Sequence, residues 1–473
     1  MPTAKPNPPR DVSTRIAHVL EIAIFIALLT LIALTAIPYG TNGPMAKALF
    51  ECVVLTLAAL WIIEGLLSGS WWRPVHRLLV PAVALVAYAF LQTLPFTKAN
   101  IGGGIERGVW RAALSFDPQS TRLAAMSLVA YVLTLGLLLR YTNTRRRLRA
   151  LIYLVIGIAA LSALFGMVRQ MTQHEAGFLL PGLMPNVGYG QFINYDHFAF
   201  LMEMALGLIL GLIVAGGVRR EKMLIYLAPA LPLWAALVLS NSKGGILSML
   251  TQMLFLVLIY SVSRPGRDAS EKPTRLLRAA RSSVVRAAII VALLVGLVFS
   301  VSWLGGERLA GRFAENREIT PIELIGRDVT PRRQVWLSTW QVIKAHPVAG
   351  VGFGAYWVAI DEFSDRSGQY KPFEAHNDYL DLLASGGLIG FVLAGWLVFL
   401  VIKRARIQLR ATDPFRRAAC AGALVGLFGV SVHSLVDFGL QRTVNAVIFV
   451  VLIAIATAEI EGGRTRSGKG DGE

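Results

Sequence analysis

Polar residues gather at four places where long apolar segments begin or end, and their types could support acid–base or anion-binding chemistry. Ionisable groups at membrane depth are costly, so each is a candidate for function. If the four clusters share one side of a membrane, a single pocket explains them better than four coincidences. The alternative is ordinary interfacial polarity at helix ends. The candidates are Asp196 and His197, Lys243, His376 with Asn377 and Asp378, and His433 with Asp437.

His376 is the candidate base within these clusters. A neutral imidazole accepts a proton well near neutral pH, so His376 could activate a hydroxyl group. It could instead be a structural or helix-capping histidine satisfied by Asp378. No H-E-x-x-H or comparable spacing surrounds it, and we therefore predict no metal site.

The segment "TPRRQVWLSTWQVIKAHPVAG" predicts a helix outside the apolar runs. Thr330 suits the N-cap, Pro331 suits the first helical position, and the helix should end at His346. Trp336, Trp340 and Ile343 would form one apolar stripe against the membrane face.

Arg332 and Arg333 occupy the first turn of that helix, where cations oppose the helix dipole. An anion bound at the helix N-terminus would offset this cost, because N–H groups and guanidinium groups both match phosphate oxygens. We predict that both arginines bind phosphate, with Lys243 as a further ligand. Pairing with Asp328 or Glu323 of the same segment is the alternative.

The stretch "AGVGFGAY" resembles a nucleotide loop only superficially, since it follows a helix and lacks the third glycine at the required spacing. We interpret it as a flexible turn. No G-x-x-x-x-G-K-[ST] motif occurs in the chain, which disfavours ATP as its substrate.

The composition places these residues in a membrane protein. The 473 residues are 55% hydrophobic with a mean hydropathy of +0.58, and the apolar runs are long enough to cross a bilayer. We predict an all-α integral membrane protein with about twelve transmembrane helices. The expected spans are 16–37, 45–67, 78–95, 121–140, 149–168, 195–217, 223–240, 244–262, 286–305, 379–402, 418–438 and 441–459.

The net charge of +17 indicates an orientation rather than a nucleic-acid partner. Lys and Arg concentrate in the loops and tails that an even number of spans puts on one side, which predicts both termini in the cytoplasm. Residues 306–378 then form one long periplasmic loop with short helices, between nine spans in 1–305 and three in 379–459. Residues 460–473 form a basic cytoplasmic tail, and all four polar clusters face the periplasm.

The periplasmic side has no ATP, so group transfer there needs a donor that arrives already activated. A glycan on a polyprenyl pyrophosphate fits, because cations would neutralise the pyrophosphate and stabilise the charge that grows as its bond breaks. Pyrophosphate leaves without an acid, so one base for the acceptor hydroxyl suffices. Attack opposite the leaving group would invert the anomeric centre. We expect no cofactor.

Residues 185–455 resemble the family of bacterial O-antigen ligases and O-antigen polymerases. The resemblance rests on "GYGQFINYDHFAF", "SNSKGGILSM", "RRQVW…HPVAGVGFG", "AHNDYLDLLASGGLIG" and "HSLVDFGLQRTVNAVIF". It implies an inner-membrane glycosyltransferase that uses undecaprenyl-pyrophosphate-linked glycans, with Arg332 on the pyrophosphate and His376 activating the acceptor. The family's Ser-Arg-Gly pattern has Lys243 in place of the arginine, and Ser385 stands where a glutamate is usual.

The acceptor remains open between lipid A core, a protein and a growing glycan, so ligase and polymerase are both compatible with the residues. A twelve-span secondary transporter is a further alternative. Glu203, seven residues after Asp196, is the feature that favours transport. Such transporters usually show internal repeats and midplane polar groups, whereas here the polar clusters share one face. A scaffolding role would leave the buried charges unexplained.

Overall fold

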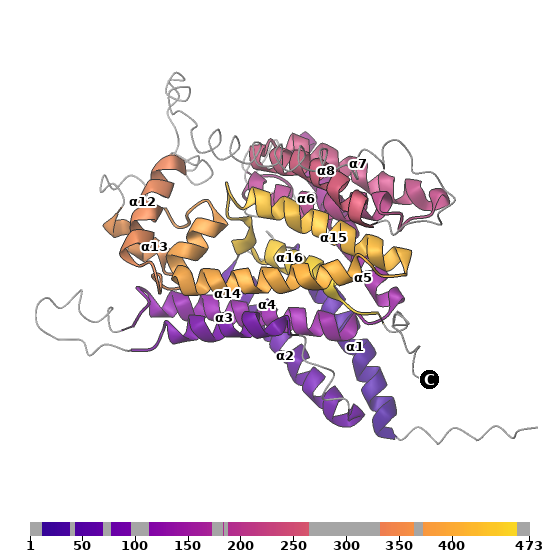
Figure 1. The fold of residues 1–473 in the computed structure, drawn as a ribbon, viewed down its shortest axis with the longest axis horizontal. Helices are drawn as coiled ribbons and strands as arrows, with labels where there is room; N and C mark the ends of the chain where they lie inside the picture. Colours follow the sequence, from indigo (N-terminus) through magenta and orange to yellow (C-terminus); the bar gives the residue numbers. More distant parts are fainter. Residues whose placement is uncertain are drawn as a thin grey trace, which may run out of the picture.

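A computed structural model shows an assembly of long helices with two short helices at one end (Figure 1). The structure describes residues 12–37, 43–69, 77–95, 113–172, 183, 188–263, 332–363 and 372–460. Within these ranges the regular structure is helical, and pairing between extended residues is limited to isolated bridges such as Tyr189 with Phe192.

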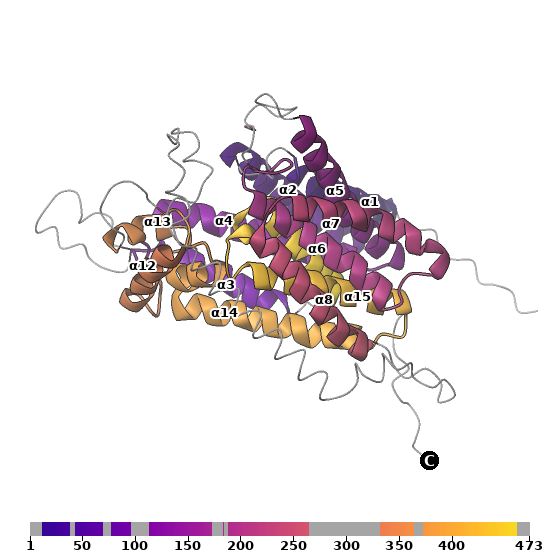
Figure 2. The same ribbon diagram turned by 90° about the horizontal axis from the view of Figure 1, so that it is seen from above.

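The helices follow one another in this order: α1 (Val12–Thr35), α2 (Pro44–Ser68), α3 (Leu79–Leu91), α4 (Pro118–Tyr141), α5 (Arg145–Thr172), α6 (Tyr195–Val214), η1 (Arg220–Lys222), α7 (Met223–Leu239), α8 (Lys243–Ser263), α12 (Arg332–Ala345), α13 (Tyr356–Ala359), η3 (Ile360–Glu362), α14 (Asp378–Gln408), α15 (Pro414–His433), η4 (Gly439–Gln441) and α16 (Thr443–Thr457). Figures 1 and 2 both place α12 and α13 at one end of the molecule, and Figure 1 shows the tips of α1 and α2 splayed away from the other helices.

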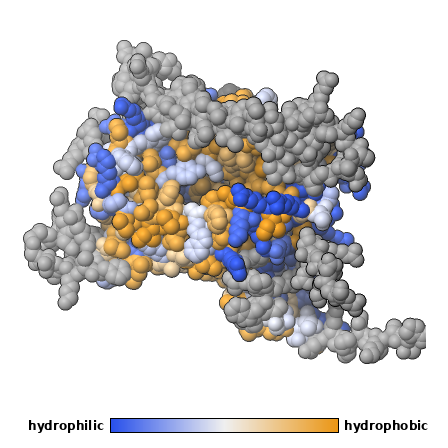
Figure 3. Space-filling view, viewed as in Figure 1, coloured by the Kyte–Doolittle hydropathy of each residue, from blue (hydrophilic) through white to orange (hydrophobic). Residues whose placement is uncertain are grey.

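The chain is an all-α polytopic membrane protein. Eight described helices are long and apolar enough to cross a membrane, and three shorter apolar helices accompany them. Together they correspond to eleven of the twelve predicted ranges, and the remaining range, 286–305, lies outside the described residues. The total of twelve is therefore not confirmed. Figure 3 shows a broad apolar area across the visible face, as expected for a surface in contact with lipid.

Glycine residues set the closest helix pair, α6 against α15. A Cβ atom at Gly207 would lie 2.5 Å from the backbone nitrogen of Gly426, and one at Gly211 would lie 2.2 Å from the Cα atom of Gly422. Each helix therefore presents a small-x-x-x-small pair, which lets backbones approach closely within a membrane. This crossing brings the polar start of α6 and the polar end of α15 to the same place.

Gln252 and Ser248 of α8 bind this helix to α6 and α15 through side-chain hydrogen bonds. The Gln252 side-chain amide donates to the carbonyl oxygens of Glu203 and Val425, at 3.0 and 3.1 Å, and the Ser248 hydroxyl donates to that of Gly429 at 2.8 Å. Because such bonds satisfy polar groups in an apolar interior, they fix how α8 rotates against α6 and α15.

The predicted turn "AGVGFGAY" connects α12 to α13 and packs against a break in α14. Gly350, Gly352 and Gly354 all have positive φ, between 67° and 103°. Gly387 of α14 also has a positive φ, 61°, and interrupts the helix there. A Cβ atom at Gly350 would lie 2.4 Å from the Ser385 carbonyl oxygen, so the two backbones touch. This contact anchors the end of α12 to α14.

Replacing Gly387 by alanine should destabilise the protein by about 1–3 kcal/mol, because the added Cβ meets a crowded backbone at a positive φ. That Cβ atom would lie 2.3 Å from the Val348 carbonyl oxygen. Gly395 on the same helix is the matched control, since a Cβ there meets nothing within 4 Å. Thermal unfolding of both variants in detergent tests this. Equal melting temperatures for the two variants would contradict the prediction.

Helix α12 buries Val335, Thr339, Val342 and Ile343 against the protein, whereas Trp340 is 47% exposed. The stripe of Trp336, Trp340 and Ile343 that we expect against the membrane face stays a prediction. The predicted span 418–438 is too long, since α15 ends at His433 and the following residues turn back toward α14. Asp378 fastens that turn, as its backbone N–H donates to the Ser434 carbonyl oxygen at 2.9 Å.

Candidate active site

Arg332 lies between two carboxylates that come from distant parts of the chain. Its Nη2 atom is 3.4 Å from Oδ2 of Asp196 and 3.5 Å from Oδ2 of Asp437. The Arg332 side chain is 18% exposed, and those of Asp196 and Asp437 are 7% and 1% exposed. Buried carboxylates require a counter-charge, which explains why the first residue of α12 turns inward. The pairing partners considered from the sequence, Asp328 and Glu323, lie outside the described residues.

Asp437 lies just beyond the end of α15 and stays ionised at neutral pH. Burial by itself would raise the pKa of Asp437. The facing His376 ring and the charge of Arg332 outweigh burial, and they lower the pKa of this carboxyl well below its ordinary value. Phe438 adds a backbone N–H bond to Oδ1 of Asp437 at 2.8 Å. The site therefore contains a permanent anion that can orient a neighbouring donor.

His376 is held beside Asp437 in an unusual backbone conformation. Its φ is 49°, in the left-handed region that side chains other than glycine rarely adopt. The residue is 6% exposed, its Nδ1 atom is 3.8 Å from Oδ1 of Asp437, and its ring meets Phe438 edge to face with centroids 4.7 Å apart. Such strain is typical of functional positions.

Asn377 and Asp378 hold the segment that carries His376. The Asn377 side-chain oxygen caps α14 by accepting from the N–H groups of Tyr379 and Leu380, and its amide donates to the Leu435 carbonyl oxygen at 2.7 Å. The Asp378 carboxylate accepts a hydrogen bond from the Ser434 hydroxyl at 2.8 Å. The carboxylate that faces His376 is thus Asp437, rather than the Asp378 considered from the sequence.

The start of α8 contributes Ser242 and Lys243. The Ser242 hydroxyl donates to Oδ1 of Asp196 at 2.5 Å and accepts from the Gly245 N–H at 3.1 Å. Asn241 supplies the turn before it with a φ of 58°. Lys243 is exposed and begins the helix directly after Ser242. Sequence reasoning overlooked Ser242, although it adjoins the candidate Lys243.

His433 and His197 lie deeper. His433 is paired with Glu203 through Nδ1 and Oε2 at 3.2 Å, and both side chains are fully buried. The Phe200 ring stacks on the His433 ring with centroids 4.1 Å apart. His197 is also buried and meets Phe438 edge to face at 4.9 Å.

Arg442 is a further cation near the site that sequence reasoning missed. Its guanidinium lies 5.1 Å from the Phe438 ring centroid, and Nη2 is 3.1 Å from Oε1 of Glu374. It stands within the quoted stretch "HSLVDFGLQR", five residues after Asp437, so its position in that motif was a usable signal. Arg333, in contrast, is exposed on α12.

Asp196, His433 and Asp437 place potential metal-binding atoms within 4.8 Å of one another. The two carboxylates already face the Arg332 guanidinium, and His433 faces Glu203. A divalent cation would have to compete with these partners for the same atoms, so the residues fit a cationic side chain better than a metal.

The fold and the site define a class of protein: a multi-pass membrane protein whose helix ends enclose a buried cluster of Arg, Asp and His. Residues 228–395 match the family model Wzy_C, described as O-Antigen ligase, so this part of the chain is an O-antigen ligase domain. The match extends from α7 into α14 and includes Lys243, Arg332 and His376. No curated protein matches the chain. The family performs glycan transfer of the ligase or polymerase type.

Proposed function

We propose that the protein transfers a glycan from undecaprenyl pyrophosphate to an acceptor hydroxyl on the periplasmic side of the bacterial inner membrane. The observation that carries this proposal is the position of Arg332 beside the His376–Asp437 pair. An anion-binding group and an oriented base, 3.5 and 3.8 Å from the same carboxylate, are the two parts that such a transfer requires.

Arg332 is the proposed principal ligand of the pyrophosphate. It stands in the first turn of α12, where backbone N–H groups also favour an anion. Arg333 and Lys243 are proposed as outer ligands of the pyrophosphate, because both are exposed. Arg333 follows Arg332 in the first turn of α12, and Lys243 is the first residue of α8. Their charges neutralise the leaving group without a metal ion.

His376 is the proposed general base. The Asp437 carboxylate faces Nδ1 of His376 at 3.8 Å, and the His376 imidazole takes the proton of the acceptor hydroxyl. The acceptor oxygen then forms a bond to the anomeric carbon, and the bond from that carbon to the pyrophosphate oxygen breaks. The electron pair leaves with undecaprenyl pyrophosphate, and the anomeric centre is inverted. Asn377 and Asp378 are proposed to hold the base, while Asp196, His197 and His433 line the acceptor side.

Ligase and polymerase activities differ only in the acceptor, and product analysis separates them. Purified protein in liposomes would receive a polyprenyl-pyrophosphate glycan, with and without lipid A core, and the glycolipids would be measured by mass spectrometry. We expect a single transfer that requires the added acceptor, as a ligase makes. A ladder of lengthening lipid-linked glycans would identify a polymerase instead. Absence of both product and released prenyl pyrophosphate would contradict the proposal.

A further inference from the structure

Glu203 is buried in the middle of α6, and sequence and site together give it no role in the transfer. Its side chain is fully buried, and its Oε2 atom lies 3.2 Å from Nδ1 of His433. An ionisable pair at this depth is expensive to bury and therefore needs a functional account.

Several contacts fix the His433 ring in one orientation. Glu203 holds Nδ1, and Phe200 stacks against the ring face. On the other side, a Cβ atom at Gly244 would lie 2.5 Å from Nε2 of His433, so only glycine leaves room for the ring. These contacts therefore hold the His433 imidazole in a single orientation.

Three carboxylates surround this one imidazole. Glu203 lies at Nδ1, and a ring nitrogen of His433 lies within 4.8 Å of a carboxylate oxygen of both Asp196 and Asp437. Arg332 is the cation that those two aspartates share. When Arg332 engages a pyrophosphate, the aspartates would be left as two neighbouring buried anions unless another cation stays beside them.

We propose that Glu203 is a positioning residue that keeps His433 in place as an imidazolium, whose charge holds Asp196 and Asp437 while Arg332 turns to the pyrophosphate. This inference rests on the proposed function, because it assigns Arg332 to the donor. Glu203 acts through His433 and does not touch the substrate.

The charged and titratable groups that face His433 define what a pH experiment reports. They are Glu203, Asp196 and His197 from α6 and Asp437 after α15. Arg332 of α12 and His376 before α14 contact these aspartates, and Lys243 begins α8. A substitution at Glu203 changes only the group that holds Nδ1.

The test measures binding of undecaprenyl pyrophosphate to full-length protein in liposomes from pH 5.5 to 8. At pH 8, Glu203→Gln should bind roughly tenfold to a hundredfold more weakly than wild type, because a neutral His433 leaves Arg332 to the aspartates. The difference should shrink toward pH 5.5, since a lower pH protonates an imidazole without help from a carboxylate. Glu203→Asp should restore part of the affinity at pH 8.

Glu51→Gln is the matched control. Glu51 is also a glutamate of a membrane helix, and it accepts a hydrogen bond from Ser127 at 2.6 Å, on α2 and α4 rather than at the site. We expect wild-type affinity for it at every pH.

The outcomes distinguish the inference about Glu203 from the proposed function. Wild-type affinity of Glu203→Gln, or an equal loss at all pH values, would overturn the inference but leave the proposed function if Arg332→Ala still weakens binding about a hundredfold or more. A wild-type protein that binds no undecaprenyl pyrophosphate would overturn both. A Glu203→Gln variant too unstable to assay is replaced by His433→Gln, which should show a loss at pH 8 that persists at pH 5.5.

Discussion

Replacing His376 by alanine should lower the rate of glycan transfer roughly a hundredfold to ten-thousandfold, the usual contribution of a general base. The physical reason is its place beside the carboxylate of Asp437, whose Oδ1 atom lies 3.8 Å from Nδ1. Transfer is measured by mass spectrometry of products. Binding of undecaprenyl pyrophosphate should stay close to wild type, because the positive charge at the site comes from other residues.

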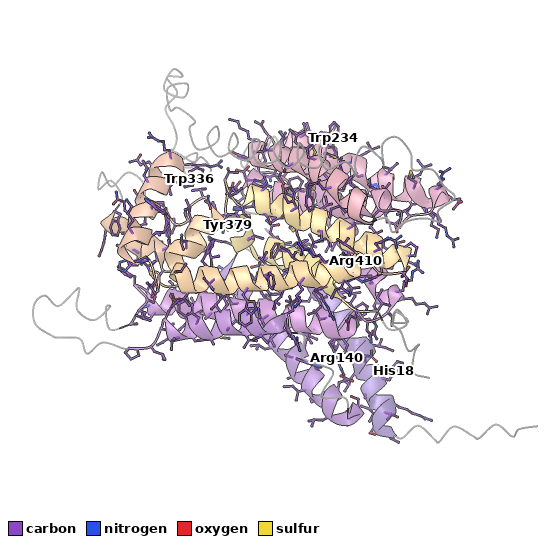
Figure 4. The ribbon with its side chains drawn as sticks, viewed as in Figure 1. His18, Arg140, Trp234, Trp336, Tyr379 and Arg410 are labelled. Atoms are coloured by element: carbon purple, nitrogen blue, oxygen red, sulfur yellow. The ribbon has the colours of Figure 1, made fainter. Side chains whose placement is uncertain are left out.

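His18→Ala is the matched control for that experiment. His18 is on α1 with a side chain 63% exposed, and its Nδ1 atom lies 3.5 Å from Oε2 of Glu21. Figure 4 shows it at the end of the molecule opposite to Trp336 and Tyr379, which mark the candidate active site. The His18→Ala variant should transfer glycan at the wild-type rate. A His376→Ala variant as active as His18→Ala would remove His376 as the base.

Replacing Arg332 by alanine should weaken binding of undecaprenyl pyrophosphate about a hundredfold to a thousandfold, on the scale of losing one charged donor to a developing anion. The affinity of Arg332→Lys should lie between those of wild type and Arg332→Ala, because lysine keeps the charge but lacks the bidentate guanidinium. Binding to protein in liposomes is the measurement, with the melting temperature recorded alongside it. Arg333→Ala should have a smaller effect, since Arg333 is exposed.

The melting temperature is needed because Arg332 also neutralises Asp196 and Asp437. Its removal leaves two buried carboxylates without that guanidinium, which costs roughly 3–5 kcal/mol in comparable cases. Arg410→Ala is the control, since Arg410 is exposed beyond the end of α14 and away from Trp336 and Tyr379 (Figure 4). A folded Arg332→Ala protein with wild-type affinity would contradict its role as the pyrophosphate ligand.

Much of the architecture could be predicted because each membrane helix carries its own signal. Burying about twenty apolar residues in a bilayer needs no knowledge of the other helices, and eleven predicted ranges correspond to described apolar helices. Helix ends were less predictable. The predicted span 418–438 continued past His433 because Val436 and Phe438 are apolar, yet they belong to a packed turn rather than to the helix.

The candidate site was predictable in its residue types and less so in its pairings. Polar residues at apolar segment ends identified Asp196, His376 and Asp437, because burying charge is costly wherever it occurs. The acids considered as alternative partners of Arg332 were close in sequence, whereas the structure pairs it with Asp196 and Asp437. Ion pairs between distant segments depend on which helices pack together, and local patterns carry no record of that.

The sequence by itself determined the class of protein, the helix order and the candidate residues, since hydropathy and residue type act locally. Only the tertiary structure decided that Asp437 faces His376, that two aspartates share Arg332, and that Glu203 pairs with His433. The pairing of Glu203 with His433 follows from the close crossing of α6 and α15 at their glycines. That crossing is decided by how whole helices pack, because a glycine permits a close approach without specifying its partner.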